Sequence, residues 1–336
     1  MDIAMVLEWV IKAAVIVAVM TGGFAYVTWL ERKQLARMQV RYGPNRAGIF
    51  GLLVPVADGI KAIFKEELIP DKADKFLFVI APVLTVIPSL IVTAVIPWGR
   101  SIDLFGRTVS LYLTDINVAV LYILCVTSMS IYGITLASWA SNNKYSMMGG
   151  LRATAQMISY ELALGLAVLG PVMMARSMSI VNIVEAQKGL WFVIPQMLAF
   201  VIYIMTSLAE INRNPFDMSE AEQELTGGYN TEYSGMKFAL FFMAEYIKMI
   251  AISMIGSSLF LGGYLGPGID LPSPWGPLLG LGYFFGKTIL WIMCLIWVRA
   301  TLPRIRYDRL MALGWKVLFP LALLNVLVTA AIQIWK

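Results

Sequence analysis

Residues 76–97 read FLFVIAPVLTVIPSLIVTAVIP, a run of 22 residues that contains no charged side chain. A transmembrane α-helix needs roughly 20 mostly apolar residues to cross the hydrocarbon core of a bilayer. The length and composition of this run therefore predict a membrane span.

Seven further runs along the chain are of similar length and mostly apolar, although each contains one or more charged residues. They predict an all-α integral membrane protein, with about eight transmembrane helices in a single polytopic membrane domain over residues 1–336. The first run is too long for a signal-peptide core and follows an acidic start, so it is expected to be retained. Glu8 and Lys12, which interrupt it, are four residues apart and can pair on one helix face. The expected spans are 3–30, 76–97, 115–137, 153–175, 190–211, 236–262, 278–300 and 313–335.

The composition of the 336 residues indicates the same class of protein. Apolar residues make up 59% and charged residues 14%, against roughly 25% charged residues in soluble domains. Histidine is absent, which excludes a histidine-held haem, a histidine-based zinc site and a Ser-His-Asp triad. Cys125 and Cys294 both lie in apolar runs and cannot alone supply a four-cysteine iron–sulfur site. No metal site is expected in this chain.

The distribution of lysine and arginine predicts the orientation. Of the 26 basic residues, 18 fall in or beside the connections after spans 1, 3, 5 and 7, and five fall on the opposite side. Because positively charged loops stay in the cytoplasm, both termini are expected on the outer, periplasmic side. The same rule accounts for the basic pI of about 9.1, so no nucleic-acid partner is expected.

The first cytoplasmic connection contains a predicted amphipathic helix at about 51–68. Apolar residues recur at helical spacing from Leu53 to Phe64, whereas Asp58, Lys61 and Lys65 lie on another face. Such a segment is too short and too charged to span, so it is expected at the membrane interface. A plain surface anchor is an equally simple interpretation.

Carboxylates are concentrated around spans 4 to 6. Six acids lie between Glu210 and Glu232 with Arg213 as the only base among them, while Glu161 and Glu245 lie within spans 4 and 6. A solvated helix explains such a charge run, and Glu245 with Lys248 can form a static ion pair. However, an ionised side chain at bilayer depth costs roughly 2.5–3.5 kcal/mol on insertion scales, so it normally faces a cavity, pairs or relays protons.

These motifs resemble the H subunit family of bacterial NADH:quinone oxidoreductase (respiratory complex I), whose mitochondrial counterpart is subunit 1. The resemblance covers nearly the whole chain in order. It rests on Glu31-Arg-Lys33, Arg41-Tyr-Gly-Pro-Asn-Arg46, Ala57-Asp-Gly-Ile-Lys61, Ser141-Asn-Asn-Lys-Tyr-Ser146, Arg152-Ala-Thr-Ala-Gln156, Ser159-Tyr-Glu161, Arg213-Asn-Pro-Phe-Asp217, Glu220-Ala-Glu-Gln-Glu-Leu225, Glu232-Tyr-Ser-Gly-Met-Lys237 and Arg299-Ala-Thr-Leu-Pro-Arg304.

The resemblance implies two groups of functional residues and no covalent catalysis by this chain. The first group is a proton path leading from the quinone site toward the antiporter-like subunits: Glu161, Glu210, Asp217, Glu220, Glu222, Glu224 and Glu245. The second group lines the quinone chamber or its entrance: Glu31, Arg32, Arg41, Arg46, Asp58, Arg213, Phe216 and Arg299. The amphipathic helix then becomes a wall of the portal for a lipid-soluble quinone.

The resemblance also implies partners and a location. Quinone is the substrate, and the chain alone binds no cofactor, because FMN and iron–sulfur clusters belong to other subunits. The partners are the peripheral quinone-site and iron–sulfur subunits, small membrane subunits, antiporter-like subunits and membrane lipid. The bacterial inner membrane is the expected location.

Other functions fit the same residues. A related membrane-bound hydrogenase or ferredoxin-dependent quinone reductase contains a similar membrane subunit, and its electron-input subunits would distinguish it. A stand-alone ion transporter could use the intramembrane acids as its ion site. A purely structural anchor would have no role in coupling.

Overall fold

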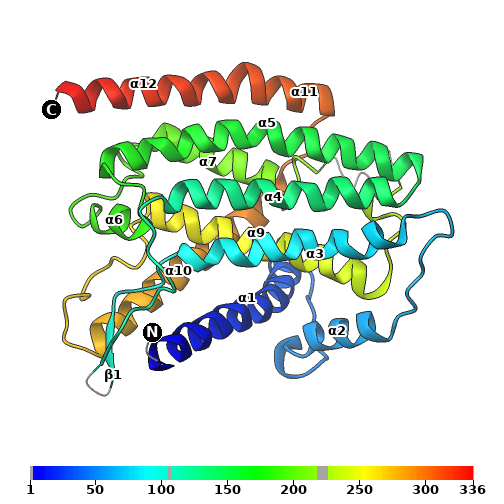
Figure 1. Cartoon of the computed structure of the whole chain (residues 1–336), viewed down its shortest axis with the longest axis horizontal. Coiled ribbons are helices and arrows are strands. Elements are labelled where there is room, and N and C mark those ends of the chain that lie inside the picture. The colour runs from blue at the N-terminus through cyan, green and yellow to red at the C-terminus, as the bar shows by residue number, and fades with distance from the viewer. Residues whose placement is uncertain (1–2, 105–106, 218–225, 336) are drawn as a thin grey trace.

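The computed structural model describes residues 3–104, 107–217 and 226–335. Figure 1 shows long helices lying side by side, with a short hairpin at one end and α2 at the other. The elements in chain order are α1 (Ile3–Met38), η1 (Ile49–Gly51), α2 (Val54–Phe64), α3 (Lys75–Ile91), η2 (Val92–Val95), β1 (Ile102–Leu104), β2 (Arg107–Val109), α4 (Ala119–Ala140), α5 (Lys144–Ala175), α6 (Ile180–Glu185), α7 (Met197–Glu210), η3 (Gly228–Asn230), α9 (Gly235–Phe260), α10 (Trp275–Thr301), α11 (Tyr307–Leu313), the π-helical turn η4 (Gly314–Leu318) and α12 (Phe319–Trp335).

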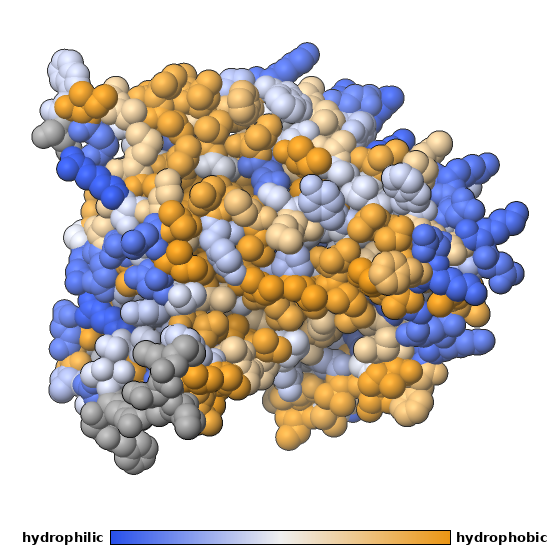
Figure 2. Space-filling model, in the orientation of Figure 1, coloured by the Kyte–Doolittle hydropathy of each residue, from blue (hydrophilic) through white to orange (hydrophobic). Residues whose placement is uncertain are grey.

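The predicted fold class, an all-α integral membrane protein, is confirmed. Seven helices in the described ranges are long and apolar enough to cross a membrane. The two short strands form one antiparallel hairpin, with Ile102 opposite Val109. Figure 2 shows a broad hydrophobic band across the middle of the molecule and hydrophilic residues gathered toward both ends. That distribution suits a chain whose middle faces hydrocarbon and whose ends face water.

The predicted span 190–211 has a different local structure. Its helix, α7, covers only Met197–Glu210, about 21 Å at 1.5 Å per residue, whereas residues 192–196 form turns. Pro195 lacks an N–H and disfavours a helical conformation for Ile194 before it, so the helix begins only after the proline. The Val193 N–H donates to the Phe260 carbonyl at the end of α9 (3.0 Å). Apolar composition alone does not reveal this break.

The other expected elements differ mainly in their ends. Helix α1 continues to Met38, about 54 Å from its start at 1.5 Å per residue, so its last turns project beyond a bilayer. The amphipathic helix covers Val54–Phe64 rather than 51–68. The last span continues from α11 through the π-helical turn into α12, where Pro320 lacks the N–H of a regular helix.

Helix α9 forms the centre of the bundle. It packs against α1, α3 and α10, and every residue from Tyr246 to Phe260 is buried. Because α9 carries Glu245 and Lys248, this packing places both ionisable side chains inside the protein rather than toward lipid.

Both chain termini lie at one end of the bundle, together with the hairpin and α6 (Figure 1). We call this the terminal end, and the end with α2 the opposite end. Two termini at the same end agree with an even number of crossings. The side of the membrane that each end faces remains a prediction from the basic residues.

An ion-pair cluster stabilises the terminal end. Arg100 Nε lies 3.2 Å from Glu185 Oε1, the Tyr264 hydroxyl donates to the same oxygen (2.7 Å), and Lys188 pairs with Glu185. Burial raises the pKa of Glu185, but Lys188, Tyr264 and Arg100 together outweigh burial and hold that pKa below its ordinary value. The folded protein therefore favours the ionised carboxylate.

Glu185→Gln is expected to lower the melting temperature at about pH 7, and the difference from the wild type should disappear as the pH falls through the lowered pKa of Glu185. A depressed folded-state pKa stabilises the protein above the ordinary carboxyl pKa of 4.5 and loses this effect as pH falls through the folded value. Thermal unfolding of both proteins across this range measures the effect. Asp308→Asn, which removes an exposed pair with Arg306, should change the melting temperature little. A difference that persists at low pH would contradict this electrostatic origin.

Candidate functional site

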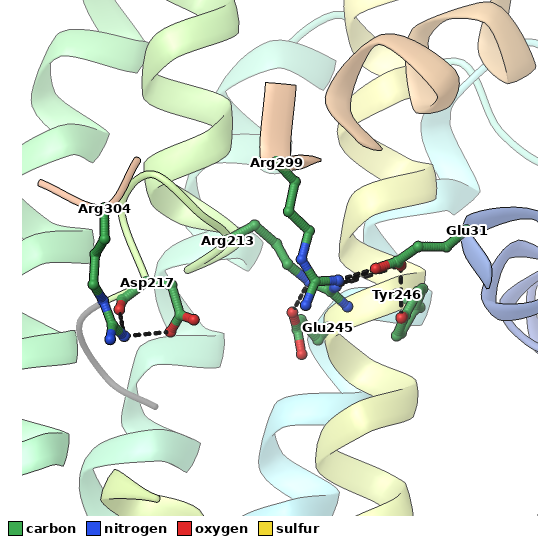
Figure 3. Close-up of polar contacts among 7 residues, drawn as sticks. All are labelled: Glu31, Arg213, Asp217, Glu245, Tyr246, Arg299 and Arg304. Atoms are coloured by element: carbon green, nitrogen blue, oxygen red, sulfur yellow. Dashed lines mark hydrogen bonds and ion pairs between the residues drawn. The ribbon is translucent and has the colours of Figure 1, made fainter. Parts of the chain in front are cut away.

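Glu31 near the end of α1 is the centre of a buried polar network. Its carboxylate lies 3.1 Å from Nη1 of Arg213, which follows α7, and it also pairs with Arg299 near the end of α10. The Tyr246 hydroxyl on α9 donates to Glu31 Oε2 (2.7 Å), and Arg213 pairs with Glu245 on α9. Figure 3 shows these side chains converging from four segments. We call these five residues the Glu31 network.

The Glu31 network balances two acids with two bases inside the protein. Glu31 is 4% and Arg213 6% exposed, so solvent screens their interaction weakly. Burial disfavours the charged guanidinium, but Glu245, Tyr246 and Glu31 outweigh burial and hold the pKa of Arg213 above its ordinary value. Arg213 pairs with both Glu31 and Glu245, and Glu31 also pairs with Arg299. A change of charge at one member therefore alters the electrostatic balance of the whole network.

Gln156 on α5 positions Arg213. Its side-chain amide donates to the carbonyls of Ala209 (2.9 Å) and Phe216 (2.8 Å) and to Asn212 Oδ1 (3.1 Å). These bonds hold the segment that leaves α7, where Asn212 adopts a positive φ of 55°. The Arg213 guanidinium also lies over the Tyr246 ring, 4.4 Å from its centroid, in a cation–π arrangement.

A second acidic group continues from Glu245 into the bundle. Glu210 at the end of α7 is 4% and Lys248 on α9 8% exposed, and the positive charge of Lys248 interacts electrostatically with Glu210, Glu161 and Glu245. Helix α4 supplies the hydroxyls: Ser130 accepts from Lys248 Nζ (2.7 Å), and Ser128 donates to Glu161. We call Glu161, Glu210, Glu245 and Lys248 the acidic route.

A small cavity connects three members of the acidic route. Its volume is about 30 Å³, and Glu210, Glu245 and Lys248 all line it, together with Ser130 and Asn212. That is enough room for a water molecule with several polar partners. One water molecule in this cavity would lie within reach of all three side chains.

A larger cavity of about 630 Å³ opens beside the Glu31 network. Its described lining includes Arg299, Arg304 and Asp217 with the aromatic rings of Phe238 and Phe242. Arg304 Nη2 lies 3.5 Å from Asp217 Oδ1 and also donates to the Asp217 carbonyl (Figure 3). Arg299 belongs to both this cavity and the network, so it links the two.

The predicted chamber residues separate into groups. Glu31, Arg213 and Arg299 come together in the network. Arg32 pairs with Asp58 on α2 (2.8 Å), away from that cluster. Arg41 and Arg46 are exposed, and Arg41 donates to Gln39 (2.6 Å). Phe216 is 2% exposed and packs against Tyr160 in the core.

The predicted proton-path residues also divide. Glu161, Glu210 and Glu245 lie along the acidic route, whereas Asp217 lines the larger cavity. Glu220, Glu222 and Glu224 lie outside the described residues.

Three contributors are absent from the sequence prediction: Tyr246, Arg304 and Gln156. Tyr246 directly follows Glu245, and Arg304 and Gln156 end two of the quoted motifs, so each stands beside a recognised signal. The hydrogen-bond partners named above lie 53 to 215 positions away along the chain, which residue spacing cannot reveal. The sequence indicates Lys248 only as a partner for Glu245. Among the described residues, no cluster of three His, Cys, Asp or Glu side chains is arranged to hold a metal ion.

The chain matches known proteins over almost its whole length. The family described as NADH dehydrogenase matches residues 11–330. The NADH-quinone oxidoreductase H subunit 2 of Syntrophobacter fumaroxidans is 50% identical over 324 residues, covering 96% of this chain and 95% of that protein. The corresponding H subunit 2 of Geobacter metallireducens is 47% identical and covers 99% and 97%, and the H subunit of Thermomicrobium roseum is 46% identical and covers 96% and 94%.

Proposed function

Because this chain belongs to the NADH dehydrogenase family, we propose that it is the membrane-embedded H subunit of a proton-pumping NADH:quinone oxidoreductase. In this assembly it forms the membrane side of the quinone chamber and the acidic path that couples quinone reduction to proton translocation. The observation that carries the proposal is the continuity between the larger cavity, the Glu31 network and the acidic route. This chain supplies no redox centre to the enzyme.

The larger cavity is the part of the chain best suited to receive a quinone headgroup. Phe238 and Phe242 offer apolar ring faces, while Arg299 and Arg304 offer positive charge to a reduced, negatively charged headgroup. Helix α2 exposes apolar residues such as Val56 and Ile60 toward its surroundings. That face is available to a lipid-soluble chain at the portal.

The route from the cavity to the membrane interior passes through shared ion pairs. A new negative charge in the cavity attracts Arg299, which then interacts less with Glu31. Arg213 shifts its interaction toward Glu31, and Glu245 loses part of its compensation. Glu245 then takes up a proton. This change in turn redistributes charge among Lys248, Glu210 and Glu161. Each step is a change of pairing within described contacts, so no large motion is needed.

The proposed assembly follows from the family. FMN and iron–sulfur clusters belong to partner subunits, and the peripheral quinone-site subunit closes the chamber. Small membrane subunits and antiporter-like subunits continue the path beyond Glu161. The proposed location is the bacterial inner membrane, with both termini on the periplasmic side.

Glu210→Gln tests the coupling role. The substitution keeps the size of the side chain but removes a titratable group from the acidic route. NADH:quinone activity and the proton gradient should fall by about tenfold or more, as loss of a proton-transfer group typically causes. Reduction of ferricyanide by NADH should stay near the wild-type rate, because it bypasses the quinone site.

Glu67→Gln is the matched control, since Glu67 pairs with Lys237 outside the route. It should leave all three activities unchanged. Full quinone activity in an assembled Glu210→Gln complex would make the route structural. Proton flux through the purified chain alone in liposomes would instead support a stand-alone transporter.

A further inference from the structure

A half-open groove lies beside α1 at the terminal end, away from the larger cavity. Its volume is about 140 Å³. Ile11, Val15 and Ile16 of α1 form one wall, and Ile96, Trp98 and Leu113 lie on the facing segment. Figure 1 shows this end of α1 beside the hairpin. The lining is almost entirely apolar, and it includes no member of the Glu31 network or the acidic route.

The groove opens toward the membrane. Ile11 is 54% and Val15 48% exposed, although both lie in a predicted span. Only 11% of the most apolar window of α1 is buried inside the protein. An apolar depression on a membrane-facing helix is filled by hydrocarbon, so a lipid acyl chain fits the chemistry of the walls. Trp98 and Tyr112 in the lining are residue types that mark the level of lipid headgroups.

One end of the groove carries a fixed charge pair. Lys12 lines the groove and donates from Nζ to Ser110 (2.9 Å). Glu8 lies one turn closer to the terminus, and its carboxylate is 2.6 Å from Lys12 Nζ. The positive charge is therefore the deeper of the two, beside the apolar walls, and the negative charge lies toward the membrane surface.

This order of charges is complementary to a zwitterionic aminophospholipid. In such a lipid the phosphate lies next to the acyl chains and the ammonium lies outermost. With an acyl chain along Val15 and Ile16, the phosphate meets Lys12 and Ser110, and the ammonium meets Glu8. An ammonium has three N–H donors for a carboxylate, which a trimethylated headgroup lacks. A purely anionic headgroup would leave Glu8 facing a negative charge.

We propose that the Glu8–Lys12 end of this groove is a binding site for one phosphatidylethanolamine molecule. The lipid seals α1 against the facing residues Ile96, Trp98 and Leu113, far from the quinone cavity. Its headgroup selectivity comes from the direction of the Glu8–Lys12 pair, and its position along the helix comes from the apolar walls.

Photolabelling in nanodiscs tests the proposal on the purified full-length protein. Trace photoactivatable phosphatidylethanolamine or phosphatidylglycerol with identical chains is added, and mass spectrometry counts labelled peptides from residues 6–17 and 95–113. We expect about fivefold more labelling by phosphatidylethanolamine, the ratio that one partly screened ion pair supplies. Equal labelling by both lipids would overturn the headgroup assignment.

Two variants separate the groove from its charges. Val15→Trp fills the groove and should reduce labelling to background, whereas Val17→Trp, on the opposite side of the same helix at about 100° per residue, should not. The charge-swapped Glu8→Lys/Lys12→Glu variant keeps the ion pair but reverses its direction, so it should lose the preference for phosphatidylethanolamine. A preference that survives the swap would refute the proposal even if the Val15→Trp protein cannot be purified.

Discussion

Arg213→Met is expected to abolish nearly all NADH:quinone activity and to lower the melting temperature markedly. Arg213 is 6% exposed and pairs with both Glu31 and Glu245, and methionine retains much of its apolar length. Removing one partner of a buried ion pair costs about 3–5 kcal/mol, because an uncompensated charge stays inside the protein. Thermal unfolding of the purified protein and NADH:quinone turnover in membranes measure the two effects.

A second substitution separates stability from coupling. Arg299 still pairs with Glu31 in the Arg213→Met protein, so Glu245 becomes the less compensated acid. Adding Glu245→Gln should recover part of the loss in melting temperature without restoring quinone activity. Such a partial recovery would show that the two positions are energetically coupled. Arg306→Met, which removes only an exposed pair with Asp308, should resemble the wild type. A stable and active Arg213→Met complex would remove the Glu31 network from the proposed mechanism.

Lys248→Met is expected to stop proton pumping while the protein still assembles. The positive charge of Lys248 interacts electrostatically with Glu161, Glu210 and Glu245, and Lys248 lines the small cavity that joins Glu210 and Glu245. Methionine fills a similar volume but removes the positive charge that stabilises the ionised carboxylates. NADH-driven dye quenching in membrane vesicles should fall to background, with NADH:quinone activity reduced by about tenfold or more.

Lys248→Arg distinguishes charge from shape. Arginine keeps its positive charge permanently, so the Lys248→Arg complex should retain more quinone activity than the Lys248→Met complex. Because arginine does not release a proton, the Lys248→Arg complex should still pump poorly. Lys72→Met, an exposed lysine at the opposite end, should change neither readout. Normal pumping by Lys248→Met would show that the carboxylates work without a central base.

The sequence predicts the helices well because hydrocarbon imposes a strong length and polarity requirement on each span. The uncharged run at 76–97 corresponds to α3 and η2, from Lys75 to Val95, and all seven long helices overlap predicted spans. The exception is α7, where residues 190–194 are apolar but not helical. Burial beside α9 satisfies that backbone locally, and hydropathy does not record which part of an apolar run is buried in protein.

The partners of the charged residues are harder to predict. Spacing along one helix suggests that Glu245 pairs with Lys248, three residues away, but the Glu245 carboxylate pairs with Arg213 on another segment. Tyr246 and Glu31 meet across 215 positions. Each of these contacts depends on how α1, α9 and α10 pack together, and a single sequence contains no direct signal for that packing.

Composition and hydropathy alone determined that this chain is a helical membrane protein with its acids concentrated around spans 4 to 6, because a charge inside a bilayer is costly enough to leave a visible pattern. The motifs alone determined its family. Only the tertiary structure decided that Glu31, Arg213, Glu245 and Arg299 share one buried network, that Phe216 belongs to the core, and that Glu8 and Lys12 border an apolar groove. The physical reason is that ion pairs and cavities arise between helices, and their geometry is set by packing contacts between residues far apart in the chain.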